Sequence, residues 1–360
     1  MSNVLGDLFK LSIYGDSHGK ALGGVLDGCP PGLAIDEEQI GYDLKRRKSG
    51  HDFFSSPRSE DDRYEILSGI RNGKTTGGPI GFIIYNSDFQ PDDYRELDSI
   101  FRPSHADFTY FAKYGSEESA GKLHASARIF APVVLAGAIA KQVLLRSDIR
   151  VSAFVRQIGT VSLDTPYTLL DLSTIEQSPV RCPDKETSEK MLRLLKNIKK
   201  AGDSTGGVIT GVISGCPPGV GDPVFDKLQA RLAHAMFSIN AVKGFEYGSG
   251  FDSAAMTGST HNDLFIVRKH RLRTKTNNSG GIQGGISNGE DIYFNVAFKP
   301  VPGIRLKQKT VDRNADYVEF ATGGRHDICF VPRAVPVVEA MSALVLADSY
   351  LKHLVYAEKY

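Results

Sequence analysis

The stretch GDSHGKALGGVLDGCPPG, residues 15–32, occurs a second time as GDSTGGVITGVISGCPPG at residues 202–219. The copies lie 187 residues apart, and eleven of their eighteen positions are identical. In each copy an apolar, β-forming segment runs into Gly-Cys-Pro-Pro-Gly, where the two prolines end the strand and glycine permits the turn. The repeat predicts two halves related by an internal pseudo-twofold symmetry.

A helix is expected after each copy. Asp36 precedes EEQIGYDLKRRK, which has acidic residues in its first turn and basic residues in its last, as the helix dipole favours. Asp222 and Pro223 precede VFDKLQARLAHAMFSI, and proline suits the first helical position. We therefore expect one domain over residues 1–360, divided into halves of about 1–185 and 186–360.

Three further helices are expected from apolar or amphipathic patterns. They cover residues 126–147, 184–201 and 334–355, and the first should carry Pro132 near its start. Between the predicted elements lie glycine- and asparagine-rich stretches such as residues 275–289. Loops of this length are more often functional than idle.

Composition excludes several classes of protein. The formal net charge of +1 argues against a general nucleic-acid or membrane-surface binder. The four cysteines show no C-x-x-C spacing, and no metal site is expected. No signal peptide is visible at the N-terminus, and the longest apolar run, residues 129–140, is too short to span a bilayer. We expect a cytoplasmic protein that acts on a small molecule.

The repeat is unequal at one position, where His18 in the first copy faces Thr205 in the second. A histidine in a short turn can be held near a ligand, and its ordinary pKa suits proton transfer. The alternative is a purely structural turn. Because the same turn closes with threonine in the second copy, the histidine is not needed for the turn itself.

Three other polar segments are candidates for chemistry. Arg102 and His105 flank Pro103, a pairing suited to holding and protonating an anionic leaving group. Arg325 and Asp327 stand two apart, so they face the same side if the segment is extended. A basic set comprises residues 45–48, Arg58, Arg128 and Lys299. The alternatives are surface turns and a solvated helix end; converging arginines would instead mark a phosphate-bearing substrate.

Taken in order, seven segments resemble the motifs of the chorismate synthase family. They are GDSHGKALGGVLDGCPPG, FRPSHADFTYFAKYG, SARIFAPVVLAGAIAK, FSINAVKGFEYGSGF, GGIQGGISNG, FKPVPGI and GRHDICFVPRAVPVVEAM. They extend from residue 8 to about residue 350. The resemblance implies an α+β fold, a β-α-β sandwich with central helices between antiparallel sheets, which agrees with the internal duplication.

The resemblance also implies an activity. Members of this family remove phosphate from 5-enolpyruvylshikimate 3-phosphate by a 1,4-anti elimination, give chorismate for aromatic amino acid biosynthesis, and require reduced FMN. They assemble as homotetramers. The flavin is reduced either by NADPH on the enzyme or by a separate flavin reductase, and the sequence leaves both routes open.

The family's roles transfer to matching positions. His18 is expected to keep the reduced flavin in its required protonation state, His105 to protonate the departing phosphate, and Asp327 to assist deprotonation at the flavin. Arg47, Arg58, Arg102 and Arg128 are the expected substrate-binding residues. The expected flavin-binding residues are His124, Ala125, Ser126, Asn240, Ala241, Gly284, Lys299, Pro300, Val301, Pro302, Gly303 and Arg325.

The chain departs from the family pattern at two positions. His124 stands where the family commonly has arginine, and a histidine cannot reproduce a bidentate arginine contact. Phe53 lies where many members carry another arginine, and we expect Lys48 or Arg58 to replace that charge. Two alternatives to the lyase stay open: a flavin oxidoreductase that transfers hydride to its substrate, and a scaffold that binds phosphorylated metabolites without catalysis.

Overall fold

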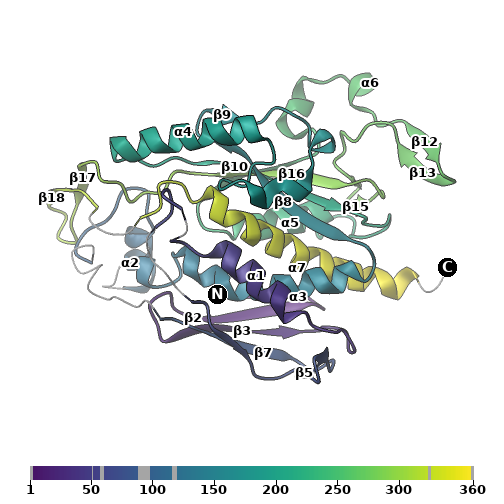
Figure 1. The fold of residues 1–360 in the computed structure, drawn as a ribbon, viewed down its shortest axis with the longest axis horizontal. Helices are drawn as coiled ribbons and strands as arrows, with labels where there is room; N and C mark the ends of the chain where they lie inside the picture. The colour runs from purple at the N-terminus through teal and green to yellow at the C-terminus, as the bar shows by residue number, and fades with distance from the viewer. Residues whose placement is uncertain are drawn as a thin grey trace.

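Two antiparallel five-stranded sheets enclose a layer of helices in the computed structural model, which describes residues 3–50, 52–56, 61–87, 98–115, 120–322 and 326–357 (Figure 1). The first sheet has the order β1 (Val4–Leu5), β2 (Lys10–Gly15), β3 (Ala21–Asp27), β7 (Ile80–Tyr85), β4 (Tyr64–Ile66). The second has the order β11 (Val242–Tyr247), β16 (Ile292–Phe298), β10 (Gly207–Ser214), β8 (Arg150–Ile158), β9 (Val161–Ser162). The α+β sandwich is confirmed.

The helical layer consists of α1 (Glu37–Arg47), α3 (Ala131–Leu145), α5 (Leu228–Phe237) and α7 (Val331–Ala357). Helix α3 contacts β2, β3 and β7, whereas α7 contacts β8 and β10. Gly137 of α3 lies so close to Ala340 of α7 that an added Cβ would be 2.3 Å from the Ala340 Cβ. The missing side chain therefore lets the two central helices pack tightly.

The duplicated stretch forms the middle of both sheets. Its apolar parts are β3 and β10, each the third of five strands. Gly28 and Gly215, which follow these strands, have φ angles of 76° and 77°, a left-handed conformation that glycine adopts without steric cost. The turns before the strands also match, because His18 N donates to Lys122 O and Thr205 N donates to Ile328 O. These acceptors precede α3 and α7 respectively, so the internal symmetry extends to the central helices.

Most predicted helices are confirmed. The Asp36 carboxylate caps α1 by accepting from Gln39 N at 3.0 Å, Pro132 lies in the first turn of α3, and Asp184 caps α4 (Lys185–Ala201). The predicted start of the second repeat's helix was wrong: α5 begins at Leu228, because Val224 has a left-handed φ of 66° and Leu228 N donates to Gly285 O at 2.9 Å. The division near residue 185 stays a prediction, and β8 and β9, before that residue, belong to the second sheet.

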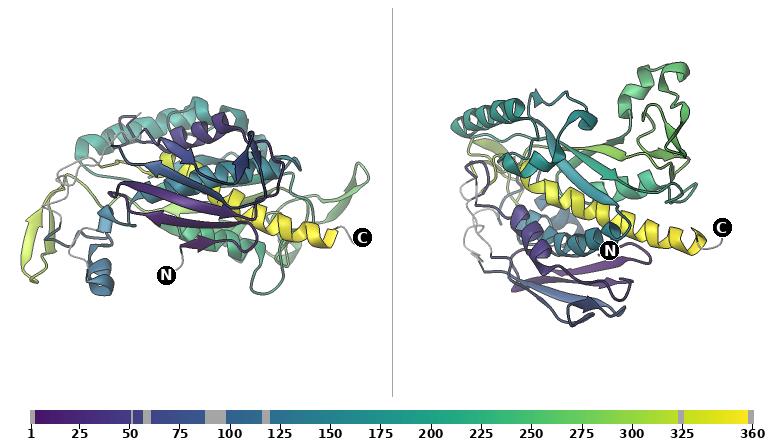
Figure 2. Two further views of the ribbon diagram at one scale, coloured as in Figure 1. Left: turned by 90° about the horizontal axis from the view of Figure 1, so that it is seen from below. Right: turned by 45° about the vertical axis from the view of Figure 1, so that its right-hand side comes forward.

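The residues between these elements form smaller units. They are the hairpins β5 (Ile70–Arg71) with β6 (Lys74–Thr75), β12 (Phe265–Arg268) with β13 (Arg271–Thr274), β14 (Ile282–Gln283) with β15 (Ile286–Ser287), and β17 (Gln308–Val311) with β18 (Tyr317–Phe320), together with α2 (Asp107–Tyr114) and α6 (Gly258–His261). The β12–β13 hairpin projects from the second sheet (Figure 2).

Two helical segments, Ala127–Leu145 and Val331–Ala357, are long and apolar enough to cross a membrane. Of their most apolar windows, 78% and 89% respectively are buried inside the protein. Both segments therefore belong to the helical core of the sandwich.

Candidate active site

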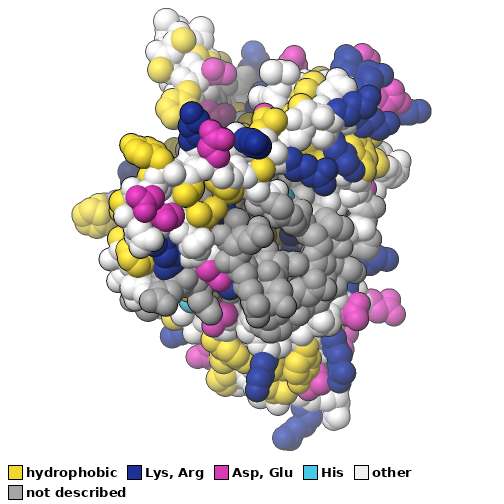
Figure 3. Space-filling view, turned by 90° about the vertical axis from the view of Figure 1, so that its left-hand side faces the viewer, with side chains coloured by type: hydrophobic (Ala, Val, Ile, Leu, Met, Phe, Trp, Pro, Cys, Tyr) yellow, Lys and Arg dark blue, Asp and Glu magenta, His cyan; other side chains and the backbone are white. Residues whose placement is uncertain are grey.

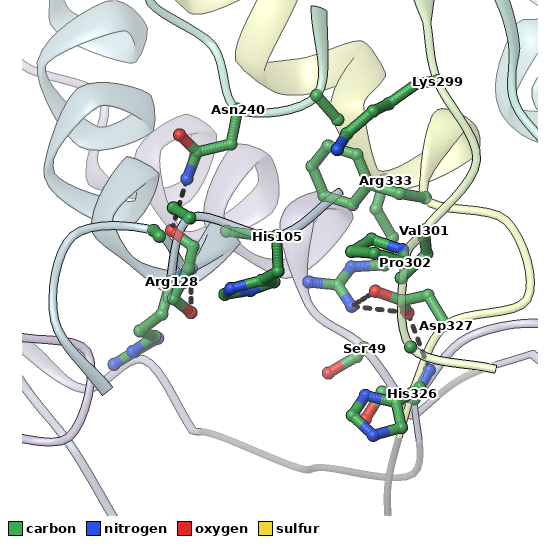
Figure 4. Close-up of a pocket in the computed structure, with 18 of the residues that line it drawn as sticks. Ser49, His105, Arg128, Asn240, Lys299, Val301, Pro302, His326, Asp327 and Arg333 are labelled. Atoms are coloured by element: carbon green, nitrogen blue, oxygen red, sulfur yellow. Dashed lines mark hydrogen bonds and ion pairs between the residues drawn. The ribbon is translucent and has the colours of Figure 1, made fainter. Parts of the chain in front are cut away.

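A cavity of about 420 Å³ lies at the end of the sandwich where α7 begins. Its walls come from the end of α1, the segments before α2 and α3, the turn between α5 and β11, the segment after β16, and the start of α7 (Figure 4). The predicted site residues that line it are Arg47, Arg102, His105, Ala125, Ser126, Arg128, Asn240, Ala241, Lys299, Val301, Pro302, Gly303 and Asp327. Segments far apart in the sequence therefore meet at one cavity.

His105 is held by a buried ion pair at the start of α2. The Asp107 carboxylate accepts from Arg102 Nε at 2.7 Å and from Arg102 Nη2 at 2.8 Å. His105 Nδ1 lies 3.0 Å from Asp107 Oδ1 and 3.0 Å from Arg102 Nη2. Because Arg102 and Asp107 are only 6% and 3% exposed, this is a fixed buried cluster and not a solvated surface turn.

The same cluster sets the charge state of His105. Burial lowers the pKa of His105 below its ordinary value; the hydrogen bond to Asp107 opposes this effect, and the charge of Arg102 adds to it. Burial raises the pKa of Asp107, but hydrogen bonds from Arg102 and His105 hold it well below the usual range. At neutral pH the carboxylate is therefore ionised and the imidazole neutral. An anion bound beside the ring would favour its protonated form.

Asp327 lies on the other side of the cavity, paired with Arg333 of α7 (Figure 4). Arg333 Nη1 donates to both carboxylate oxygens, at 2.8 and 2.9 Å, and Ser56 N donates to Oδ1 at 2.7 Å. Burial lowers the pKa of Arg333, and the ion pair with Asp327 counteracts this. The cavity thus presents a histidine and a fully hydrogen-bonded carboxylate from opposite walls.

A second buried carboxylate connects two of the predicted substrate-binding arginines. Arg47 Nη2 donates to Asp62 Oδ2 at 2.6 Å, and Arg128 Nη1 donates to Asp62 Oδ1. Arg128 also donates from Nε to Asn86 Oδ1 at 2.8 Å and from Nη2 to Tyr85 O at 3.1 Å. Both arginines are 4% exposed, so their charges lie inside the protein.

The positive charges at the cavity suit an anionic ligand. Within the described part of the chain, the buried Nε atoms of Arg47 and Arg333 have no hydrogen-bond acceptor. A buried donor without an acceptor is costly, and an anion in the cavity would supply one. On the face of the molecule seen in Figure 3, Lys and Arg side chains gather along the upper right edge.

The predicted flavin-binding segments meet through hydrogen bonds. Asn240 Nδ2 donates to His124 O at 3.3 Å and to Ser126 O at 3.2 Å, and Lys299 N donates to Ala241 O at 2.9 Å. Ala241 has a φ of 73°, a left-handed conformation that alanine rarely adopts. Such strain persists where surrounding contacts impose it, and it gathers at binding sites.

Four predicted residues do not line the cavity. His18 is joined through its backbone to Lys122, four residues before Ser126. His124 is half-exposed, with Nε2 3.6 Å from Asp16 Oδ1, and it lines a separate apolar cavity. Gly284 lies in the β14–β15 turn, and Pro300 follows Lys299 without entering the lining.

Two others, Arg58 and Arg325, fall outside the described residues.

Of the two expected replacements for the missing family arginine, Lys48 lies within the described residues. Lys48 lines the cavity, and its Nζ donates to Asp61 O. Phe53 itself lies 5.7 Å from Lys199 Nζ, measured to the ring centroid, and its carbonyl accepts from that ammonium at 3.1 Å. A basic side chain from α4 thus contacts the position where the family carries arginine.

The second copy of the repeated turn is hydrogen-bonded to segments at the cavity. Ser204 Oγ donates to Val301 O at 2.6 Å, and Thr205 N donates to Ile328 O at 3.0 Å. Val301 lines the cavity, and Ile328 follows Asp327 directly. The backbone of the repeated turn therefore contacts segments of the site in both halves, whereas only the first half carries the histidine, His18.

Sequence reasoning missed Arg333, Ser56 and Asp62. Arg333 is the one charged residue in the otherwise apolar first two turns of α7, which is a usable signal for a paired or functional charge. Ser56 contributes its backbone N–H, and Asp62 lies in an acidic run that is typical of a surface. Neither has a sequence pattern that separates it from an ordinary loop residue.

Comparisons with known proteins agree on one family. The family model described as chorismate synthase matches residues 9–351. A chorismate synthase from Christiangramia forsetii is 53% identical over 351 residues, and one from Flavobacterium psychrophilum is 51% identical over 354 residues. Each alignment covers 98% of both chains. A solved structure titled "Crystal Structure of Chorismate Synthase" is similar with a TM-score of 0.76 and 32% identity, over 95% of this chain and 91% of that one.

Proposed function

The chain belongs to the chorismate synthase family, lyases of the shikimate pathway, and we propose that it removes phosphate from 5-enolpyruvylshikimate 3-phosphate by a 1,4-anti elimination that requires reduced FMN. The observation that carries this proposal is the cavity itself, where His105 and Asp327 lie on opposite walls among buried arginines. An elimination that expels an anion needs an acid at the leaving group, a proton acceptor and a cationic clamp.

Binding of the substrate anions falls to the arginines. Among the described residues no acceptor faces the buried Nε of Arg47, and Arg102 presents a guanidinium next to the candidate acid. Guanidinium groups bind phosphate and carboxylate in a defined orientation, which an ammonium does not do. The substrate carries one phosphate and two carboxylates, so several cations in one cavity offset its charge.

His105 is the group that protonates the departing phosphate. Its imidazole is neutral while the cavity holds no anion, because burial lowers its pKa. The negative charge of the bound phosphate favours the imidazolium, and Asp107 accepts from Nδ1, which leaves Nε2 to carry the transferable proton. The acid is thus charged only when its substrate is present.

Asp327 is the acidic residue among the described residues that line the cavity, and its carboxylate would assist the removal of a proton at the bound flavin. Arg333 and Ser56 N hold its carboxylate in one orientation. A fixed carboxylate pays little reorganisation cost when a proton moves.

Reduced FMN fits the remaining wall of the cavity. Ser126, Asn240, Ala241 and the segment 299–303 would hold it, and a Cβ added at Gly303 would lie 2.9 Å from His326, so this wall has no room for a larger residue. When bound, the flavin would supply an electron-rich ring that relieves the electron deficiency created as phosphate leaves.

We also propose a cytoplasmic homotetramer, with the flavin reduced by NADPH or by a separate reductase. Exposed apolar side chains on the β12–β13 hairpin, Phe265, Val267 and Leu272, are between 65% and 73% exposed and suit burial against another subunit. The molar mass in solution, measured by light scattering, tests the tetramer.

The test of the activity is phosphate release under anaerobic conditions with reduced FMN. Wild-type protein should release phosphate from the substrate, and His105→Gln should lower kcat by about 10²- to 10⁴-fold, the usual contribution of a general acid. A scaffold without catalytic function would release none. Folded, flavin-loaded wild-type protein that releases no phosphate would refute the proposal.

A further inference from the structure

Asp62 is a buried carboxylate that does not line the cavity but contacts two residues that do. It is 3% exposed and lies just before β4. Its φ of 51° falls in the left-handed region, which Asp tolerates better than most side chains. One carboxylate oxygen accepts from Arg47 and the other from Arg128. The loop conformation therefore directs a single carboxylate between two cations.

One of those cations is fixed independently of Asp62. Arg128 also donates to Asn86 Oδ1 and to Tyr85 O, both at the end of β7. Asn86 in turn donates to Gly19 O at 2.7 Å, in the turn that carries His18. Arg128 is thus anchored to the end of β7 by two hydrogen bonds that do not involve Asp62, and the carboxylate it holds has a fixed position.

The other cation has fewer contacts. Arg47 is the last residue of α1, its Nη2 donates to Asp62, and its Nε has no acceptor within the described residues. Arg333, on the opposite wall, is close enough for the charge of Arg47 to lower its pKa. Without a carboxylate beside it, the Arg47 guanidinium would face two other buried cations and would be driven out of the cavity wall.

We propose that Asp62 is a positioning residue that holds Arg47 against the substrate anion, with Arg128 as the anchor. The inference rests on the proposed function, because it takes Arg47 to bind the substrate phosphate. Asp62 touches neither substrate nor flavin in this account. It acts through the orientation of one guanidinium.

A pure charge effect of Asp62 and a positioning role predict opposite changes in KM when Asp62 is neutralised, which makes the proposal testable. Removing a negative charge next to an anion site should tighten anion binding if Asp62 acts only through its charge. If it positions Arg47, Asp62→Asn should raise KM for 5-enolpyruvylshikimate 3-phosphate at least tenfold and change kcat less than KM. Asp61→Asn is the matched control, since Asp61 is exposed, is one residue away, and removes the same charge; its KM should stay within twofold of wild type.

A double-mutant comparison assigns the effect to Arg47. In an Arg47→Ala background, Asp62→Asn should change KM by less than twofold, because the residue that it positions is gone. Asp62→Glu should give a KM between those of wild type and Asp62→Asn. If Asp62→Asn does not fold, Asp62→Glu carries the test, since the longer side chain displaces both oxygens: KM should rise at least threefold.

The proposal would be overturned by an unchanged or lower KM in folded Asp62→Asn, by an undiminished effect in the Arg47→Ala background, or by a wild-type KM in Asp62→Glu when Asp62→Asn is unfolded. Binding of inorganic phosphate to the same proteins, measured by calorimetry, distinguishes failure of the positioning proposal from failure of the proposed function. Wild-type protein that releases no phosphate from substrate refutes the function, whereas Asp62→Asn that binds phosphate as tightly as wild type refutes the positioning role.

Discussion

Replacing Asp107 by asparagine should destabilise the protein and slow catalysis together. Asp107 accepts two hydrogen bonds from the Arg102 guanidinium, one from Arg102 N at 3.4 Å, one from His105 and one from Ala120 N at 3.1 Å. Asparagine keeps one acceptor oxygen but turns an NH₂ group toward donors, and it removes the negative charge that pairs with the buried Arg102 guanidinium. Removing one partner of a buried ion pair costs about 3–5 kcal/mol. We expect the free energy of unfolding to fall by about that amount.

The catalytic effect follows from the same contacts. Asp107 raises the pKa of His105 and fixes its ring, so Asp107→Asn should leave a misplaced imidazole that is harder to protonate. We expect kcat for phosphate release to drop about 10²-fold or more. The measurements are urea unfolding and phosphate release, with Asp252→Asn, at an exposed position, as the control.

The contribution of Asp107 to the free energy of unfolding depends on pH. Because the pKa of Asp107 is lowered in the folded protein, its contribution to stability is present above its unfolded value of 3.8 and is lost as pH falls through the folded value. The stability difference between wild type and Asp107→Asn should therefore be steady from about pH 7 to about pH 4 and shrink as pH falls further. A difference that does not shrink below pH 3.8, or a variant within about 1 kcal/mol of wild type at pH 7, would refute the reasoning.

Two further substitutions probe the scaffold and the family departures. Glu339→Gln should lower the free energy of unfolding by about 3–5 kcal/mol, because Glu339 is buried in α7 and pairs with both Arg46 and Lys141; a midpoint of urea unfolding like that of wild type would contradict this. Lys48→Ala or Arg58→Ala should weaken substrate binding if that residue replaces the arginine absent at Phe53, and unchanged affinity in both variants would remove the hypothesis.

The fold was predictable where the sequence pattern is local. Two prolines and two glycines specify the turn after β3 and after β10, and the placement of both strands at the centre of their sheets follows from near-identical segments in a symmetric fold. The start of α5 was not predictable, because it depends on a long-range hydrogen bond in which Leu228 N donates to Gly285 O. Local propensity cannot report such a contact.

The site was predictable in its residue types but not in its connections. Arg47 and Arg333 lie almost 290 positions apart, and only the packing of α1 and α7 brings their charges to one cavity. Asp62 has no sequence signal, since its role depends on a left-handed backbone and on two arginines from other elements. Pairing of buried charges is a property of the tertiary structure.

The most direct test of the central claim is the number of phosphates released for each reduced flavin. Wild-type protein is loaded with a limiting amount of reduced FMN under anaerobic conditions and given excess 5-enolpyruvylshikimate 3-phosphate, while phosphate and flavin absorbance are followed together. The account predicts many phosphates released per flavin, with the flavin still reduced at the end. One flavin oxidised for each molecule of substrate converted would contradict it and would identify a hydride-transferring oxidoreductase instead.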